Sequence, residues 1–125
     1  MEITDNTAAD RQLIEGYGGG GFRVSGTQHR GSLLIFADRS LAWPVATTDE
    51  VTFESLAAVT GAEPPVEVLL LGCGATAAPL PKALREALRA EGVVVEPMDT
   101  GAACRTFNLL MAEDRRAAAA LIAVA

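Results

Sequence analysis

The sequence predicts an α/β fold in which a small β unit precedes alternating strands and helices. Residues 22–25 alternate apolar and polar side chains with the period of a half-buried strand. Residues 66–71 are apolar except for Glu67, as in a strand that is covered on both faces. A helical pattern then separates this strand from the apolar run 93–95. A strand, a helix and a strand within about thirty residues indicate a parallel pair with a right-handed crossover.

The first third of the chain is predicted to form an antiparallel hairpin. Its two strands are 22–25 and 32–36, and the loop between them is bounded by Gly26 and Gly31. This hairpin is the small β unit of the predicted fold.

The next stretch is predicted to be an extended connection and a short helix. Pro44 favours the extended connection, because the residue before a proline is pushed out of the helical region. The helix spans 53–60, with Thr52 as its N-cap and an apolar face at helical spacing.

Two further helices and a last strand are predicted in the second half. One helix opens at Pro81, which suits a first helical turn, and stops at Gly92. The other is capped by Asp99 or Thr100. Alanine favours helix in the tail 117–125, yet an all-apolar run after a helix also suits a buried strand. We expect a strand there, covering the open edge of the sheet.

Composition excludes several classes of protein. The 125 residues and 13.0 kDa fit one domain, 1–125, in which residues 1–10 are expected to be a flexible N-terminus. Half of the residues are hydrophobic and 21% are charged, so the chain is not disordered overall. A net charge of −6 has the wrong sign for binding nucleic acid. No uncharged run reaches the ~20 residues of a membrane-spanning helix, so no membrane insertion is expected.

The cysteines and the histidine indicate a reduced, cytoplasmic protein without a metal. Cys73 and Cys104 are the two thiols, and they lack the CxxC spacing of zinc or redox sites. His29 is the sole imidazole, and no local spacing assembles a ligand set around it.

The charges are unevenly distributed along the chain. Residues 1–67 carry ten acids and four bases, while residues 68–125 carry six of each. The acidic first half is interpreted as a solvated sheet face, and an interaction surface is the alternative.

The segment 72–77 superficially matches a dinucleotide-binding fingerprint. It reads GxGxxA after a strand, and Glu96 follows Gly74 by 22 residues. Pro79 and Pro81 delay the next helix, so its amides could not lie directly behind Gly74 to bind a pyrophosphate. The glycines are interpreted as a sharp turn off the sheet, and no cofactor is predicted.

The residues that could bind a ligand gather where the strands end. A helix N-terminus at 99–108 is expected at the carboxyl edge of the parallel strands, where open α/β sheets usually place ligands. The candidate anion site consists of Gly72, Gly74, Asp99, Thr100, Arg105, Thr106 and Asn108.

Structural roles are the alternative for these residues. Asp99 would cap the helix, Arg105 would pair with an acid and Asn108 would satisfy a loop carbonyl. Cys104 lies beside Arg105 and could be a nucleophile near Cys73, but a base is missing and a buried, inert thiol is preferred. No catalytic residue is predicted.

Six segments occur in a fixed order along the chain: 16–18, 22–26, 29–34, 43–44, 70–74 and 98–108. Together they resemble one family of small domains, which includes the mitochondrial complex I (NADH dehydrogenase) assembly factor 3 and many uncharacterised bacterial and archaeal proteins.

The resemblance implies a three-layer fold, a β hairpin unit plus α/β/α, with a central mixed five-stranded sheet whose last strand is antiparallel to the rest. It also implies an assembly role with a respiratory complex subunit as partner, here in a bacterial cytoplasm. Two hypotheses therefore stand: a protein-interaction or assembly module, and an anion-binding protein or enzyme of unknown reaction that uses the strand-end site.

Overall fold

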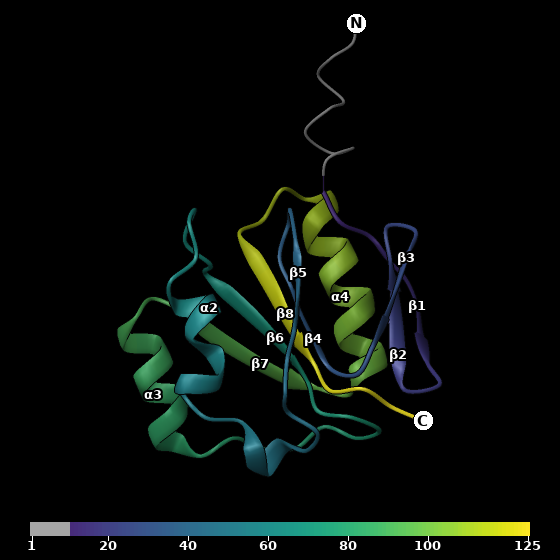
Figure 1. The fold of residues 1–125 in the computed structure, drawn as a ribbon. Helices are drawn as coiled ribbons and strands as arrows, with labels where there is room; N and C mark the ends of the chain where they lie inside the picture. The colour runs from purple at the N-terminus through teal and green to yellow at the C-terminus, as the bar shows by residue number, and fades with distance from the viewer. Residues whose placement is uncertain (1–10) are drawn as a thin grey trace, which may run out of the picture.

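A computed structural model describes residues 11–125 of the chain, which form two β-sheets and the helices that flank them (Figure 1). The flexible N-terminus predicted for residues 1–10 lies outside the described residues. The strands are β1 Ile14–Gly18, β2 Gly21–Val24, β3 Thr27–Arg30, β4 Leu33–Ile35, β5 Ser40–Ala42, β6 Val68–Gly72, β7 Val94–Met98 and β8 Ala117–Leu121. The helices are η2 Thr48–Glu50, η3 Glu54–Leu56, α2 Ala57–Thr60, α3 Lys82–Ala90 and α4 Thr100–Ala112.

The larger sheet is mixed and five-stranded, in the order β5-β4-β8-β6-β7, which confirms the predicted fold class. Strand β4 is antiparallel to both β5 and β8, while β8 is parallel to β6 and β6 is parallel to β7. Strand β4 therefore runs against the other four. The expectation that the last strand is antiparallel to the rest was wrong, because α4 returns the chain to the end of the sheet where β6 and β7 begin.

The smaller sheet is antiparallel, in the order β1-β2-β3. The second strand of the predicted hairpin was wrong. Strand β2 pairs with 27–30 and not with 32–36. Ser25 and Gly26 both have positive φ, 47° and 85°, so a tight two-residue turn folds β3 directly back on β2. The 32–36 run instead supplies β4 to the larger sheet.

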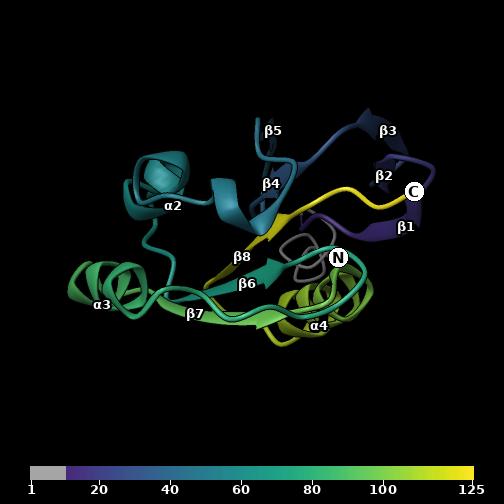
Figure 2. The ribbon, with the colours of Figure 1, turned by 90° about the horizontal axis from the view of Figure 1, so that it is seen from below.

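The two faces of the larger sheet are covered by different elements (Figure 2). Helices α2 and α3 cover one face, and α4 lies beside the smaller sheet on the other. Side chains alternate accordingly, because successive strand residues point to opposite faces. On the face covered by α2 and α3, Leu69 and Leu71 pack in one hydrophobic cluster. On the opposite face, Leu70 packs with Phe107 and Ile35 in another cluster.

The tail forms β8, which confirms the predicted strand, but it lies in the middle of the sheet instead of at an edge. Ala118, Ala119 and Ala120 are fully buried between β4 and β6. Backbone pairing on both sides and burial on both faces outweigh the helix propensity of alanine.

Local signals correctly placed the helices. Thr52 Oγ1 accepts a hydrogen bond from the Ser55 amide at 3.0 Å, where the predicted helix becomes a 3₁₀ turn followed by α2. Helix α3 ends before Gly92, whose φ of +85° suits glycine. Asp99 caps α4 by accepting from the Ala102 amide at 2.8 Å. Among residues 11–125, no helix has the length and apolarity that crossing a bilayer would require.

Candidate functional site

The double-glycine bend after β6 and the start of α4 meet at one edge of the larger sheet. The amide of Thr100 donates to the Gly74 carbonyl at 2.8 Å. Its hydroxyl accepts from the Gly74 amide at 2.9 Å and donates to the Ile122 carbonyl at 2.8 Å. Thr100 is fully buried, so one hydroxyl joins the end of β6, the start of α4 and the chain after β8.

Close approach explains why glycine stands at the end of β6. A Cβ built on Gly72 would lie 3.0 Å from the Thr100 Cα, from the Thr100 Oγ1 and from a Leu121 methyl group. The bend continues at Gly74, whose φ is +102°. The helix that follows starts only at Lys82, as the two prolines predicted. These glycines serve the backbone path and the contact with α4.

Asn108 holds the smaller sheet against α4. Its Oδ1 accepts from the Ile14 amide at 2.9 Å, and its Nδ2 donates to the Ile14 carbonyl at 2.9 Å. This pair of bonds replaces a strand neighbour for Ile14 at the edge of the smaller sheet. Asn108 thus has the structural role that was considered as an alternative, although the carbonyl it satisfies belongs to a strand.

Arg105 and Tyr17 lie together over the first turn of α4. A Cβ built on Gly101 would clash with the Tyr17 hydroxyl and would lie 3.4 Å from Arg105 Nη1. Arg105 is exposed and Thr106 is half-buried on the same helix. The anion site at the strand ends stays a prediction: the structure joins Gly72, Gly74 and Thr100 directly.

The two cysteines belong to different layers. Cys104 is buried in the cluster between α4 and the sheet, whereas Cys73 packs against the cluster on the opposite face. Burial raises the pKa of Cys104 from 9.0 to about 12, and the nearby Arg105 guanidinium only partly offsets this effect. Cys104 is therefore a neutral thiol at physiological pH, as expected of an inert core cysteine.

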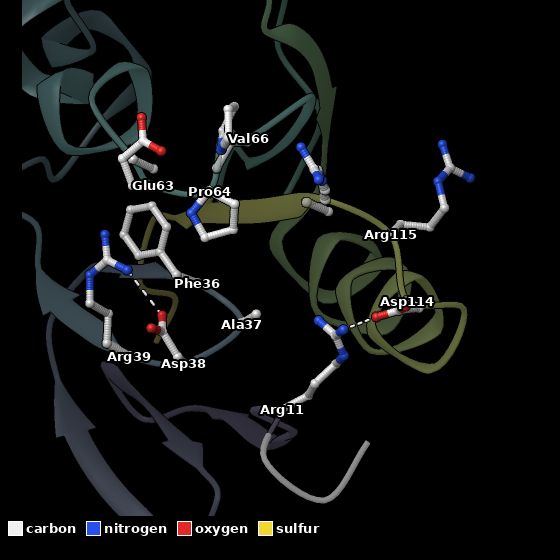
Figure 3. A pocket seen from close by; sticks show the side chains of 14 residues that line it. Arg11, Phe36, Ala37, Asp38, Arg39, Glu63, Pro64, Val66, Asp114 and Arg115 are labelled. Atoms are coloured by element: carbon white, nitrogen blue, oxygen red, sulfur yellow. Dashed lines mark hydrogen bonds and ion pairs between the residues drawn. The ribbon is translucent and has the colours of Figure 1, made fainter. Parts of the chain in front are cut away.

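A cavity of about 380 Å³ lies at the other end of the sheet, where β6 and β8 begin (Figure 3). Sequence analysis did not identify it. The lining combines basic, acidic and apolar residues: Arg11, Phe36, Ala37, Asp38, Arg39, Ala62, Glu63, Pro64, Pro65, Val66, Asp114, Arg115, Arg116 and Ala117. The only local signal was the Arg115-Arg116 pair directly before an apolar strand.

Two of its arginines are already paired with carboxylates. Arg11 forms an ion pair with Asp114, and Arg39 Nη1 lies 3.0 Å from Asp38 Oδ1. The Arg39 guanidinium also stacks 4.1 Å above the centre of the Phe36 ring. The cavity is therefore an ordered polar site with one aromatic wall.

A second cavity of about 420 Å³ lies between the start of β1 and α4. Leu13, Asn108 and Met111 are among its lining residues. Leu13 is 51% exposed, and Leu109 on α4 is 57% exposed. In the part of the chain from residue 11 onward, no cluster of three His, Cys, Asp or Glu side chains could hold a metal ion.

The chain matches characterised and uncharacterised relatives over most of its length. An uncharacterised protein of Rhodobacter capsulatus is 45% identical over 87% of this chain and 82% of its own length. The NADH dehydrogenase [ubiquinone] 1 alpha subcomplex assembly factor 3 of Danio rerio is 37% identical over 98% of this chain and 70% of its own length.

Solved structures share the fold. A Bartonella henselae crystal structure described as an outer membrane protein has a TM-score of 0.85 at 39% identity, covering 92% of this chain and 97% of that one. A solution structure of a Bordetella pertussis protein, described as a Mth938-like domain, has a TM-score of 0.79 at 28% identity, covering 98% and 90%. A family model described as a protein of unknown function (DUF498/DUF598) matches residues 14–122. The chain belongs to the DUF498/DUF598 family, and its relatives include complex I assembly factor 3, as the resemblance predicted.

Proposed function

We propose that this chain is a protein-interaction module that acts in the cytoplasm during the assembly of respiratory complex I. The observation that carries the proposal is the 37% identity to the Danio rerio assembly factor across 98% of this chain. The chain spans 70% of that relative and 66% of the human one, so the shared part is the domain described above. The partner is a subunit of the respiratory complex.

An exposed apolar surface supports this role. We define the β1–α4 face by Leu13, Tyr17 and Leu109, which are 51%, 47% and 57% exposed. The bonds between Asn108 and Ile14 bring the residues next to Leu13 and Leu109 into contact. Exposed tyrosine and leucine side chains on these two adjoining elements suit contact with a protein, because tyrosine is enriched at protein interfaces.

The test is capture of the partner with a tagged chain from the host's native lysate. We expect a subunit of NADH:ubiquinone oxidoreductase, and Leu109→Glu should reduce its recovery. Ala83→Glu is the matched control, because Ala83 is an exposed residue on α3, away from the β1–α4 face. Recovery of no such subunit, together with normal membrane NADH oxidation after gene deletion, contradicts the proposal.

The anion site at the strand ends is the second candidate. It is supported by Arg105 and the Tyr17 hydroxyl, which lie together over Gly101 at the first turn of α4. A ligand at ~100 times its dissociation constant should stabilise the fold by ~2.7 kcal/mol. The test is a melting screen with anionic metabolites. A stabilisation that survives Arg105→Ala counts against this site.

A further inference from the structure

We propose that the cavity lined by Arg11, Phe36, Arg39, Val66 and Arg116 binds a small organic carboxylate that carries an apolar group. This site lies at the opposite end of the sheet from the start of α4, and it is independent of the assembly role. Three features of the cavity support the proposal: its charge, its apolar wall and the fixed backbone around its arginines.

The charge of the cavity differs from that of the whole protein. The chain has a net charge of −6 and ten basic residues, yet four arginines line this one cavity with three carboxylates. Arg11 and Arg39 are each paired with a carboxylate. Within residues 11–125, Arg115 and Arg116 form no ion pair, and Arg115 points outward in Figure 3. Arg116 is therefore the guanidinium that we assign to the ligand carboxylate, and Glu63 is the one lining carboxylate outside these ion pairs in the described residues.

One wall of the cavity is apolar and is lined by Phe36, Pro64 and Val66. Phe36 is 3% exposed and its ring is held beneath the Arg39 guanidinium. Figure 3 shows Pro64 and Val66 beside Phe36 at the same opening. A volume of about 380 Å³ lies within the range of small-molecule sites, which combine apolar walls with a few polar groups.

The backbone around the arginines is fixed before any ligand binds. The Arg116 carbonyl accepts from the amides of Glu67 and Val68, at 2.8 and 3.2 Å, at the start of β6. The Arg11 guanidinium is held by Asp114 at the end of α4. Because the Arg116 backbone and the Arg11 side chain are already positioned, only the Arg116 side chain has to be ordered when a carboxylate binds.

The experiment is an NMR titration of the ¹⁵N-labelled full chain with benzoate as the probe. We expect saturable shifts of the amides of Ala37, Val66 and Ala117, which line the cavity. Benzamide, the neutral analogue, should produce no saturable shift of these amides. Inorganic phosphate should bind more weakly than benzoate, because it lacks the apolar group.

Three variants test whether benzoate binds in this cavity. Arg116→Gln should weaken benzoate about tenfold, as expected for the loss of a charge-assisted bond. Arg89→Gln on α3 is the matched control and should bind benzoate as the unchanged protein does. Arg116→Lys keeps the charge but cannot form a bidentate pair of hydrogen bonds. Its affinity for benzoate should therefore lie between those of the unchanged protein and Arg116→Gln.

Several results would overturn the proposal: no saturable shift with benzoate, equal binding of benzamide, equal binding of inorganic phosphate, or full affinity in Arg116→Gln. The Arg116 side chain is exposed, so its replacement should leave the dispersed spectrum of the folded protein intact. Benzoate binding that is weakened equally by Arg89→Gln would also reject the site, because it would report only the net charge.

Discussion

Replacing Thr100 by valine removes one hydroxyl and keeps the shape of the side chain. Thr100 is fully buried, and its hydroxyl bonds to the Gly74 amide at 2.9 Å and to the Ile122 carbonyl at 2.8 Å. The substitution leaves both groups without that partner. An unsatisfied buried group costs about 1–3 kcal/mol, and the amide of the half-buried Gly74 counts at the lower limit, so we expect a loss of about 2–4 kcal/mol in the free energy of unfolding. A small domain has about 5–15 kcal/mol in total, so the variant should still fold.

Urea unfolding followed by circular dichroism measures this loss directly. Thr76→Val is the matched control, because Thr76 is exposed and its hydroxyl forms no hydrogen bond within the part of the chain that the structure describes. Thr100→Ser keeps the hydroxyl and should retain most of the stability. A loss below about 0.5 kcal/mol for Thr100→Val is in the range of surface substitutions and would refute the role assigned to this hydroxyl.

Three other perturbations test the same packing and electrostatics. Gly72→Ala should destabilise by about 1–3 kcal/mol in a urea titration, because its Cβ would lie 3.0 Å from the Thr100 Cα; an unchanged midpoint contradicts this. Asn108→Ala should speed amide hydrogen exchange at Ile14 and along β1, since both hydrogen bonds between Asn108 and Ile14 are lost. Unchanged exchange would show that these two bonds do not hold β1 in place. The Cys104 pKa is raised in the folded state, so its contribution to stability is present below pH ~9 and should be lost as the pH rises towards about 12. Cys104→Ala should make the free energy of unfolding fall less steeply between pH 9 and about 12. A slope equal to that of the unchanged protein would contradict the raised pKa of Cys104.

Much of the fold could be predicted because its signals are local. Asp99 caps α4, Gly92 follows α3 and 66–71 forms most of a buried strand, all as the patterns indicated. Each of these signals depends on neighbouring residues along one element. The same reasoning missed β3, since its residues 27–30 are mostly polar and lack the alternation of a half-buried strand.

The candidate ligand sites divide in the same way. The meeting of Gly74 and Thr100 could be expected, because a strand end and the following helix start share one edge of a parallel sheet. The arginine-lined cavity could not be expected, because its walls come from four stretches of chain that are far apart in the sequence. A carbonyl-binding role for Asn108 could be considered from the sequence, but its partner Ile14 and the position of Tyr17 could not, since each depends on a contact between α4 and β1.

Local sequence patterns were enough to predict the α/β class, the positions of the main helices and a buried strand in the alanine-rich tail. Hydrophobic periodicity indicates which side of a segment is buried, and capping residues indicate where a helix begins or ends, so each signal defines a single element. The tertiary structure decided that β4 opposes its four neighbours, that β8 lies in the centre and that four arginines line one cavity. These features depend on which distant segments pair, and pairing is settled by the packing of whole faces against one another, which no single segment encodes.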